Sequence, residues 1–334
     1  MLSDKLHNAS STKRGFTFQD CASIVLFLDH VKDVESIRVE GEKEDIELNM
    51  KDGTKIFSQC KTCKIDNWDK DYKRCFSDAL RTMSESDDDN CSGLIYTTNI
   101  VRPLGSHSEQ GEFLSEDRWI KYNELSSKSR TVADSIIQDS GFDIDTDKLS
   151  FRIIGFIGET EKNKTKVVLD NIRSFIGRAR LRQTVDVDSL FSLWLDIISF
   201  NSSDENTSNF ISKKHIIWLF IGDQMDEVAP YSSDWDIATE DELKPSYNSL
   251  INQYVERVDF VSKVLADFSE WSEDKPRGQT TCDDFVKSSW QLYKEDLRAP
   301  DLSPEYQELL ITMILRKIIN LREFIRKIKE ATDL

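Results

Sequence analysis

Three strand-like segments, followed by a helix-like segment and a fourth strand, constrain the fold of this chain most strongly. The three segments are residues 36–41, 45–50 and 55–61. Lys51-Asp52-Gly53 joins the second to the third, and a three-residue loop ending in Gly is typical of β-hairpins because Gly readily adopts the left-handed conformation. Residues 69–84 then predict a helix and residues 92–98 a strand. A hairpin, a crossover helix and a returning strand predict an α/β core, with a mixed sheet flanked by helices.

Downstream of this core, the hydrophobic periodicity predicts mostly helices. Residues 112–138 are expected to be mixed helical and 149–157 to form a strand, with helices at 167–181, 189–199, 212–221, 247–271, 283–297 and 303–331. Residues 226–242 contain seven carboxylates and neither Lys nor Arg, which favours a domain boundary. We therefore expect an α/β domain with a helical extension at 13–225, an acidic linker at 226–246 and an all-α C-terminal domain at 247–334.

The charge balance restricts the partners of the chain. Its 334 residues contain 44 Lys and Arg against 61 Asp and Glu, which gives a net charge of −17. Such a chain is not expected to coat nucleic acid or anionic membrane non-specifically, so any contact with DNA must come from a local basic patch or from assembly. No apolar run approaches the roughly 18 residues of a membrane span, and the first residues lack the apolar segment of a signal peptide. The six cysteines are typical of reduced thiols. We expect a cytoplasmic protein without a membrane partner.

The hairpin brings three chemically useful side chains to one edge of the predicted sheet. If Lys51-Asp52-Gly53 is the loop, Met50 pairs with Thr54, and counting back places Asp45 opposite Gln59. Because side chains alternate along a strand, Lys61 lies on the same face as Gln59. A shift of one residue in this register would separate the three groups.

These residue types suit metal-dependent phosphodiester hydrolysis. Mg²⁺ and Mn²⁺ prefer oxygen ligands, which Asp45 and the side-chain carbonyl of Gln59 supply, and Glu40 at the end of the preceding strand is a candidate for a further ligand or base. Lys61 would stabilise charge that develops on the attacked phosphate and help to activate water. The same pattern also occurs in ordinary polar hairpins, so spacing alone leaves both readings open.

Three sequence motifs resemble a known nuclease family. They are Arg14-Gly15-Phe16-x-Phe18-Gln19, the run Val39-Glu40-Gly41 with Glu44-Asp45-Ile46, and Gln59-Cys60-Lys61-Thr62. Together they resemble the double-stranded-DNA nuclease domain of bacterial anti-phage effectors, in the Mrr-like branch of the PD-(D/E)xK superfamily, where Gln replaces the acid of the third motif. The resemblance covers about residues 13 to 220 and is sharpest over 14 to 62.

The resemblance implies a restriction-endonuclease-like fold and a set of site residues. Asp45, Gln59 and Lys61 would form the catalytic core with Mg²⁺ (or Mn²⁺), and Glu40 and Gln19 would be their companions in the active site. Cys60 stands where an aliphatic residue is usual in the family, which raises the expectation that the site is sensitive to oxidation.

The family also suggests an assembly. Similar nuclease domains occur in cyclic-oligonucleotide-activated effectors and in the nuclease subunit of Lamassu complexes, beside an SMC-like ATPase and an accessory subunit. The region after Asp226 looks too short and too regularly helical for a nucleotide-sensing domain, so the Lamassu-type reading is favoured. Its partners would be double-stranded DNA and further copies of the chain when active. The alternatives are a catalytically silent scaffold subunit, a cyclic-oligonucleotide-regulated nuclease and an RNase.

Other sequence patterns are less specific. Lys64 lies near the predicted site, and Arg173, Arg178, Arg180 and Arg182 fall within ten residues of one another. These basic residues would neutralise DNA phosphates, or would form an ordinary solvated helix face. Cys60 and Cys63 have the spacing of half a zinc site but lack a second pair at suitable spacing. No Walker A loop, G-x-S-x-G or G-x-G-x-x-G motif is present.

Overall fold

The chain divides into two compact units, which are described separately. The computed structural model describes residues 2–64, 68–105, 110–113, 115–158, 160–181, 185–228, 237–252, 257–273 and 281–334. The first unit, called here the sheet unit, comprises Met1–Arg178 and Asp186–Lys213, with Asp333. The second, called the helical unit, comprises Ala179–Val185 and Lys214–Thr332, with Leu334.

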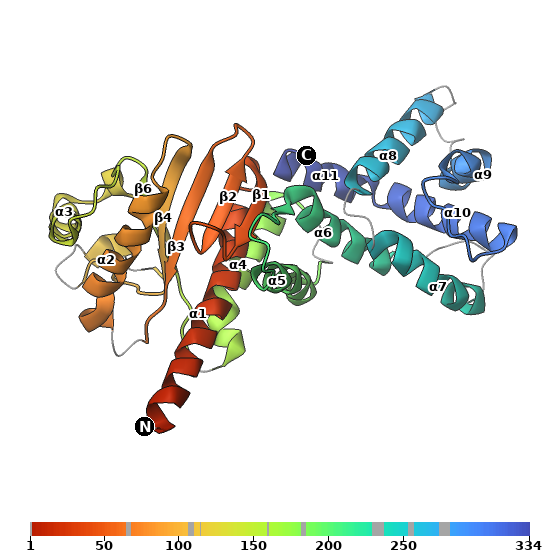
Figure 1. Cartoon of the computed structure of the whole chain (residues 1–334). Helices are drawn as coiled ribbons and strands as arrows, with labels where there is room; N and C mark the ends of the chain where they lie inside the picture. The colour runs from red at the N-terminus through yellow and green to blue at the C-terminus, as the bar shows by residue number, and fades with distance from the viewer. Residues whose placement is uncertain are drawn as a thin grey trace. The chain divides into compact units, whose positions relative to one another are not determined.

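A mixed sheet of seven strands forms the centre of the sheet unit (Figure 1). In spatial order the strands are β5 (Asp117–Lys121), β6 (Leu149–Ile154), β4 (Cys91–Thr98), β3 (Lys55–Lys61), β2 (Ile46–Met50), β1 (Val34–Val39) and β7 (Ile211–Ser212). Strands β3, β4 and β6 are mutually parallel, and the other neighbours pair antiparallel. The α/β core with a mixed sheet is therefore confirmed.

The hairpin adopts the register predicted from its loop. Asn49 pairs with Lys55, and the Met50 N–H donates to the Thr54 carbonyl at 2.9 Å. Gly53 has φ +85°, a left-handed conformation that Gly adopts without steric cost. Continuing the register places Asp45, just before β2, opposite Gln59 in β3.

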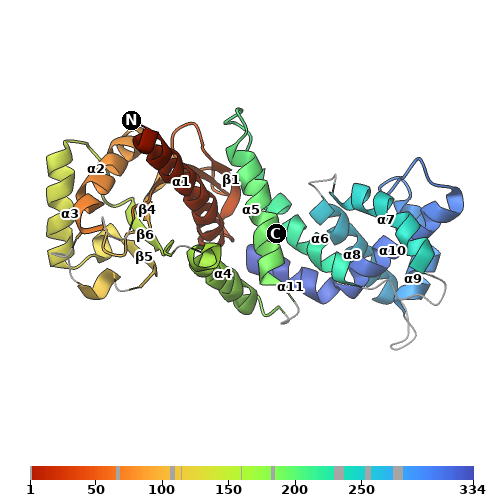
Figure 2. The same cartoon turned by 90° about the horizontal axis from the view of Figure 1, so that it is seen from below.

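Helices cover both faces of this sheet, as Figure 2 shows. One face carries α2 (Trp68–Ser86) and α3 (Ser127–Ser140), and the other carries α1 (Leu2–Asp29), α4 (Glu161–Arg178) and α5 (Val187–Ser202). Apolar residues recur on α2 at helical spacing, and its Phe76 ring lies 5.1 Å from Tyr96 and 5.2 Å from Phe151 on the strands beneath. This packing fixes α2 across β3 and β4.

The helical unit contains α6 (Lys213–Glu227), α7 (Ile237–Asn252), α8 (Arg257–Glu273), α9 (Cys282–Ser289), α10 (Pro304–Asn320) and α11 (Arg322–Thr332). Helix α6 starts at the last residue assigned to the sheet unit. The core of the helical unit includes Val261, Leu310, Ile314 and Ile318, all fully buried. Across the described segments, no helix combines the length and the apolar character that crossing a bilayer requires.

The domain limits and several elements differ from those expected. The two units divide at residues 213 and 214, before the acidic segment 226–246, and α7 occupies part of the segment expected to be a linker. Residues 229–236 of that segment lie outside the described residues. Strand β5 lies in a region predicted to be mixed helical, and the long helix predicted at 303–331 is two helices that meet at Leu321.

Candidate active site at the carboxyl end of strand β3

The carboxyl ends of the parallel strands β3, β4 and β6 form one end of the sheet, called here the carboxyl edge. The antiparallel hairpin brings the loop between β1 and β2, residues 40–45, to the same end beside β3. Two backbone hydrogen bonds close this loop, from Glu40 N–H to the Asp45 carbonyl at 2.8 Å and from Gly41 N–H to the Glu44 carbonyl at 3.0 Å. Glu40 has φ +54°, a left-handed conformation that costs a non-Gly residue about 1 kcal/mol or more. The loop conformation therefore stores strain beside the predicted site.

Asp45 is held against strand β3 by two donors. Its Oδ2 accepts the backbone N–H of Cys60 at 2.8 Å and a hydrogen bond from the side-chain amide of Gln59. Burial raises the pKa of the Asp45 carboxyl, while the Cys60 N–H and the positive charge of Lys61 oppose that rise. The carboxylate is thus oriented by the strand that carries Gln59 and Lys61.

Gln59 links this carboxylate to helix α2. It is 4% exposed, its Nε2 donates to Asp45, and its Oε1 accepts a hydrogen bond from the hydroxyl of Thr82. The Thr82 hydroxyl also lies 3.1 Å from the carbonyl of Ala79, a second acceptor within the same helix. Because a hydroxyl can donate one hydrogen bond and accept others, Thr82 can satisfy either end of the Gln59 amide.

Glu44 is a buried acid that lies beside Asp45. It is 4% exposed, its Oε1 accepts the Ser86 hydroxyl at 3.1 Å, and its Oε2 has no hydrogen-bond partner within the described residues. Burial, followed by the charge of Asp45, raises the pKa of Glu44 to about 8, against the effects of Ser86 and Lys61. Near neutral pH this carboxyl therefore carries a proton for much of the time.

Helix α1 supplies the remaining polar groups of the site. The Gln19 side chain faces Glu40 and Asp45 and lowers the pKa of each. Burial, and then the charge of Asp45, raises the pKa of Glu40. Asp20 on the same helix accepts the Ser199 hydroxyl at 2.6 Å, and burial raises its pKa as well. Four carboxyl groups at this edge thus have raised pKa values, in each case chiefly because burial disfavours the charged form.

The chain that follows Lys61 is fixed by two side chains. Asn99 is fully buried and hydrogen-bonds to both backbone groups of Cys63, accepting its N–H at 2.8 Å and donating to its carbonyl at 2.9 Å. Arg14 donates to the same carbonyl at 3.0 Å and to that of Phe156 at 3.5 Å. Lys61 itself is half-buried on the face that carries Gln59, and its charge acts on Asp45 and Glu44.

All five predicted site residues therefore lie at one edge of the sheet. Asp45 contacts Gln59, Gln19 lowers the pKa of both Asp45 and Glu40, and Lys61 acts electrostatically on Asp45. Glu44, Thr82 and Ser86 join this site without having been predicted. The only sequence signal for Glu44 was its position beside Asp45, whereas Thr82 and Ser86 are ordinary polar residues of an amphipathic helix.

Comparison with known proteins found no relative. No family model matches the chain, and no curated protein or solved structure is significantly similar to it. Support for a function therefore comes from the geometry of the site alone.

The oxygen atoms at this edge are of the type that a hard divalent cation prefers, but they are few. Among the described residues, no three His, Cys, Asp or Glu side chains are arranged to hold a metal ion. A site here would rely on Asp45, the Gln59 carbonyl and water, and Mg²⁺ in proteins characteristically keeps several waters beside one or two carboxylates. The unpartnered, buried Oε2 of Glu44 beside Asp45 is a further oxygen that could accept a hydrogen bond from a metal-bound water.

Among the residues that the structure describes, Cys60 and Cys63 belong to no group that could hold a metal ion, and the Cys60 thiol is not activated. Cys60 is 7% exposed, and burial raises the pKa of its thiol well above the usual value. The thiolate is the form that reacts, so the expectation of an oxidation-sensitive site is not supported. The Cys63 thiol donates to Asp71 at 3.3 Å.

The predicted arginine cluster does not lie at the site. Helix α4 starts beyond the carboxyl end of β6 and carries Arg173 and Arg178 in its second half, away from this edge. Arg173 pairs with Asp170 at 2.8 Å, and Arg178 donates to Ser174 at 2.8 Å. Arg180 belongs to the helical unit, and Arg182 lies outside the described residues. Of the predicted DNA-contacting residues, Lys64 alone lies at the carboxyl edge among those described.

Proposed function

We propose that the chain is a metal-dependent endonuclease that cuts double-stranded DNA. The observation that supports this proposal is the convergence of Asp45, Gln59 and Lys61 at the carboxyl end of β3, with Glu40 and Gln19 beside them. A carboxylate, an amide oxygen and an ammonium in this arrangement suit phosphodiester hydrolysis.

Asp45 and the Gln59 carbonyl would hold the Mg²⁺ or Mn²⁺, with Glu40 as a further ligand. When bound, the cation supplies Lewis-acid polarisation of the phosphate and a more acidic water. The Lys61 ammonium stabilises the negative charge that develops on the phosphate oxygens and orients the attacking water. Gln19 holds Glu40 and Asp45 in place through its side-chain amide.

Gln59 must turn its amide to act as a ligand. In the structure its Nε2 faces Asp45 and its Oε1 faces Thr82. A half-turn about the last side-chain bond points Oε1 toward Asp45, and two facing oxygens are favourable only with a cation between them. After that turn Nε2 donates to the Thr82 hydroxyl, which in turn donates to the Ala79 carbonyl. Thr82 thus acts as a positioning residue for both orientations.

The test is plasmid cleavage with Mg²⁺ or Mn²⁺ by the full chain and its variants. Lys61→Ala and Asp45→Asn are expected to lower the cleavage rate by at least a hundredfold, because each removes a group that acts on the reacting phosphate. Lys128→Ala, which changes an exposed lysine on α3, is the matched control and should cut like the parent. An unchanged rate in Lys61→Ala and Asp45→Asn would overturn the proposal and favour a silent scaffold.

The wider biological setting is part of the same proposal. An effector subunit of a Lamassu-like anti-phage complex would pair this nuclease with an SMC-like ATPase and an accessory subunit. The helical unit is the part of the chain that would make such contacts. Copurification of the full chain with the products of neighbouring genes distinguishes this setting from a cyclic-oligonucleotide-regulated effector, and cleavage of RNA in preference to DNA would identify an RNase.

A further inference from the structure

Acidic and basic side chains gather on different segments of the sheet unit, and the acidic segment 85–89 also reaches the loop that holds Asp45, through Ser86 and Asp88. The amino ends of β4 and β6 follow two acidic segments, residues 85–89 and 143–147, which contact each other through the Asp145 N–H and the Asp87 carboxylate at 2.8 Å. Together they carry Glu85, Asp87, Asp88, Asp89, Asp143, Asp145 and Asp147. Lysines pair with two of these, Lys148 with Asp87 and Lys43 with Asp88, each at 2.7 Å.

The carboxyl edge, in contrast, gathers lysines from four segments of the chain. They come from α1, from the residue after Cys63, from the first turn of α2 and from the first two turns of α4, and they are Lys13, Lys64, Lys70, Lys162, Lys164 and Lys166. Five are exposed and Lys164 is half-buried. Among the described residues, none of the six has an ion pair. Two further basic residues of α2 are paired, Arg74 with Asp71 and Lys73 with Asp139.

Helix α1 ties these segments together at the site. Arg14 donates to the Cys63 carbonyl beyond β3 and to the Phe156 carbonyl beyond β6, so this part of α1 crosses the carboxyl edge. Lys13 is adjacent to Arg14, and Phe16 lies one helical turn before Gln19 and Asp20. The Phe16 side chain is 50% exposed, which is unusual for a large apolar residue beside buried carboxylates.

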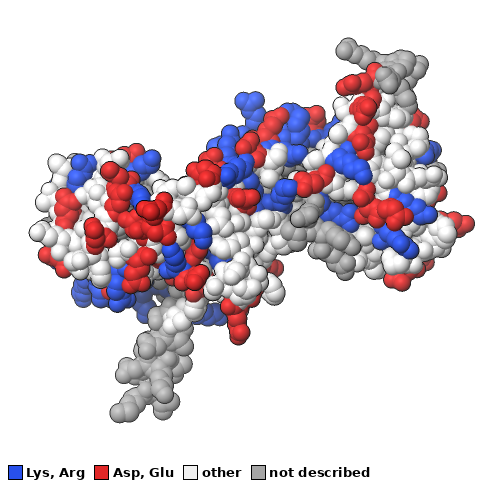
Figure 3. Space-filling model, turned by 45° about the horizontal axis from the view of Figure 1, so that its top comes forward, with Lys and Arg blue, Asp and Glu red and all other residues white. Residues whose placement is uncertain are grey.

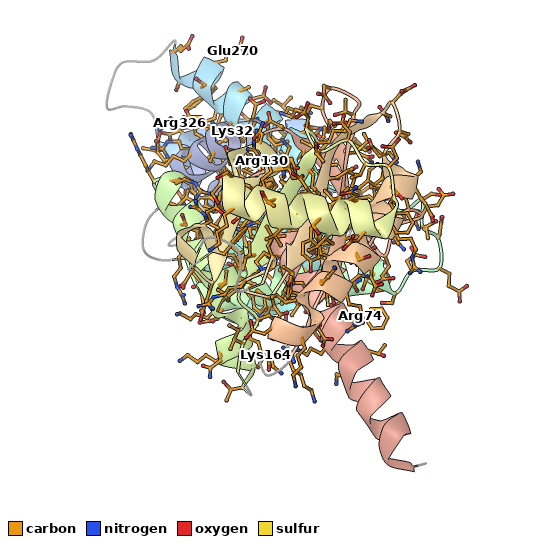
Figure 4. All side chains as sticks on the ribbon, turned by 90° about the vertical axis from the view of Figure 1, so that its left-hand side faces the viewer. Lys32, Arg74, Arg130, Lys164, Glu270 and Arg326 are labelled. Carbon is orange, nitrogen blue, oxygen red and sulfur yellow. The ribbon has the colours of Figure 1, made fainter. Side chains whose placement is uncertain are left out.

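The figures show the same separation. Figure 3 shows Asp and Glu side chains gathered on the face of the sheet unit that is turned toward the viewer, with Lys and Arg along its lower rim. In Figure 4, Arg74 of α2 and Lys164 of α4 are both at the end of the unit from which α1 projects. A chain with a net charge of −17 thus carries six lysines on the segments around its proposed active site, beside Asp69, Asp71 and Glu161 in the first turns of the same helices.

We propose that the six lysines, together with the exposed Phe16 of α1, form the surface that binds the backbone of duplex DNA and directs it into the site. This inference rests on the proposed function and adds the residues that engage the substrate. Lysines that neutralise phosphates provide affinity without reading sequence. The acidic segments 85–89 and 143–147 repel the same polyanion, which favours its approach over the lysines. The exposed Phe16 ring contacts the sugar or a base step beside the cut phosphate.

Binding can be measured separately from cutting. We would titrate a fluorescent 30-base-pair DNA duplex with the full chain carrying Asp45→Asn, in EDTA, at several salt concentrations. Replacing Lys64, Lys162 and Lys164 by Gln is expected to weaken binding by at least tenfold at low salt. It should also reduce the slope of log affinity against log salt by about 2 to 3, because each phosphate contact contributes about 0.9.

Two further variants serve as controls. Replacing the exposed residues Lys121, Lys128 and Lys287 by Gln changes the net charge by the same amount, away from the carboxyl edge. This variant should keep the DNA affinity of the parent and its dependence on salt. Arg at Lys64, Lys162 and Lys164 should retain binding, which excludes a folding defect. If both Gln triple variants lose DNA affinity equally, or if neither loses affinity, the proposed DNA-binding surface is wrong. If duplex RNA binds more tightly than duplex DNA, the assignment of the surface to DNA is wrong.

The surface and the nuclease proposal fail in different ways. If the variant with Gln at Lys64, Lys162 and Lys164 loses DNA binding while Lys61→Ala cuts normally, the proposed binding surface is supported and the proposed catalytic role of Lys61 is wrong. If Lys61→Ala is inactive but the triple binds DNA like the parent, the surface is wrong.

Discussion

At the scale of single residues, the orientation of one amide determines whether the site can take a cation. In the structure the Gln59 side chain presents its amide nitrogen to Asp45. Thr82 can also hydrogen-bond to Gln59 when the amide is turned and its oxygen faces Asp45. The hairpin register predicts that Gln59 and Asp45 face each other, because side chains alternate along a strand and the loop at Gly53 fixes which residues pair. The sequence does not predict the role of Thr82, because a residue on a helix gives no local sign of the strand that it faces.

Replacing Thr82 tests this arrangement. Thr82→Val keeps the shape of the side chain but removes the hydroxyl, so the turned amide loses its acceptor and we expect metal-dependent cleavage to fall about tenfold. Thr82→Ser retains the hydroxyl and should cut at a rate close to that of the parent. The concentration of Mn²⁺ that gives half of the maximal rise in melting temperature should increase in Thr82→Val only. Equal metal dependence in both variants would show that Thr82 does not position Gln59.

Glu44 gives the metal-free protein a dependence on pH. Its pKa is raised from 4.5 to about 8, so between these values the unfolded chain releases the proton and the folded chain retains it. Raising the pH through this range therefore favours the unfolded state. Glu44→Gln keeps a neutral group that still accepts the Ser86 hydroxyl, and in EDTA it should stabilise the chain at pH 8 by an amount on the order of 1 kcal/mol or more.

The measurement is chemical denaturation of parent and variant at pH 5 and pH 8. At pH 5 the two proteins should differ little, because Glu44 is mostly protonated in the folded parent. A variant that is equally or more destabilised at both pH values would show that Glu44 is ionised in the fold. The decisive quantity is whether the variant gains more stability relative to the parent at pH 8 than at pH 5.

At the scale of elements, the long and strongly patterned segments were predictable and the short ones were not. The hairpin strands and α2 carry clear periodicity and turn signals, and their bounds in the structure are close to those expected. Strand β5 is mostly exposed at the edge of the sheet, and β7 is two residues long, so neither has a hydrophobic pattern of its own. Such strands form because a neighbour offers unpaired backbone groups, which is information that a local sequence window does not contain.

Tertiary contacts of a single buried side chain explain why β7 lies where it does. Arg38 in β1 is fully buried and donates to the carbonyls of Asn201 at 2.6 Å, Asp204 at 2.7 Å and Asn209 at 3.3 Å. These bonds hold the segment that leads into β7 against β1. Hydrogen bonds from a charged donor each contribute about 1.5–3 kcal/mol, enough to fix a loop that carries little apolar surface. From the sequence alone, Arg38 was indistinguishable from a surface arginine.

At the scale of the whole molecule, the two units contribute different properties. The sheet unit holds the candidate site, while the helical unit buries an apolar core and three long cations, Arg257, Arg316 and Lys317. Arg316 pairs with Asp283 at 2.8 Å, and Lys317 donates to the carbonyls of Met225 and Val228. These two cations of α10 are therefore internal and are not offered to DNA, whereas the lysines of the carboxyl edge are mostly exposed.

The net charge of −17 leads to a prediction about assembly. One basic edge has to attract DNA against the negative charge of the rest of the chain, so a single copy is expected to bind and cut weakly. Association of copies would add basic edges and would place two sites on one duplex. We expect the cleavage rate per chain to rise with protein concentration, in parallel with the mass measured by light scattering. Adding Asp45→Asn chains to the parent should convert double-strand breaks to nicks, because a mixed pair has one working site. A strict monomer that linearises plasmid at a constant rate per chain would contradict this prediction.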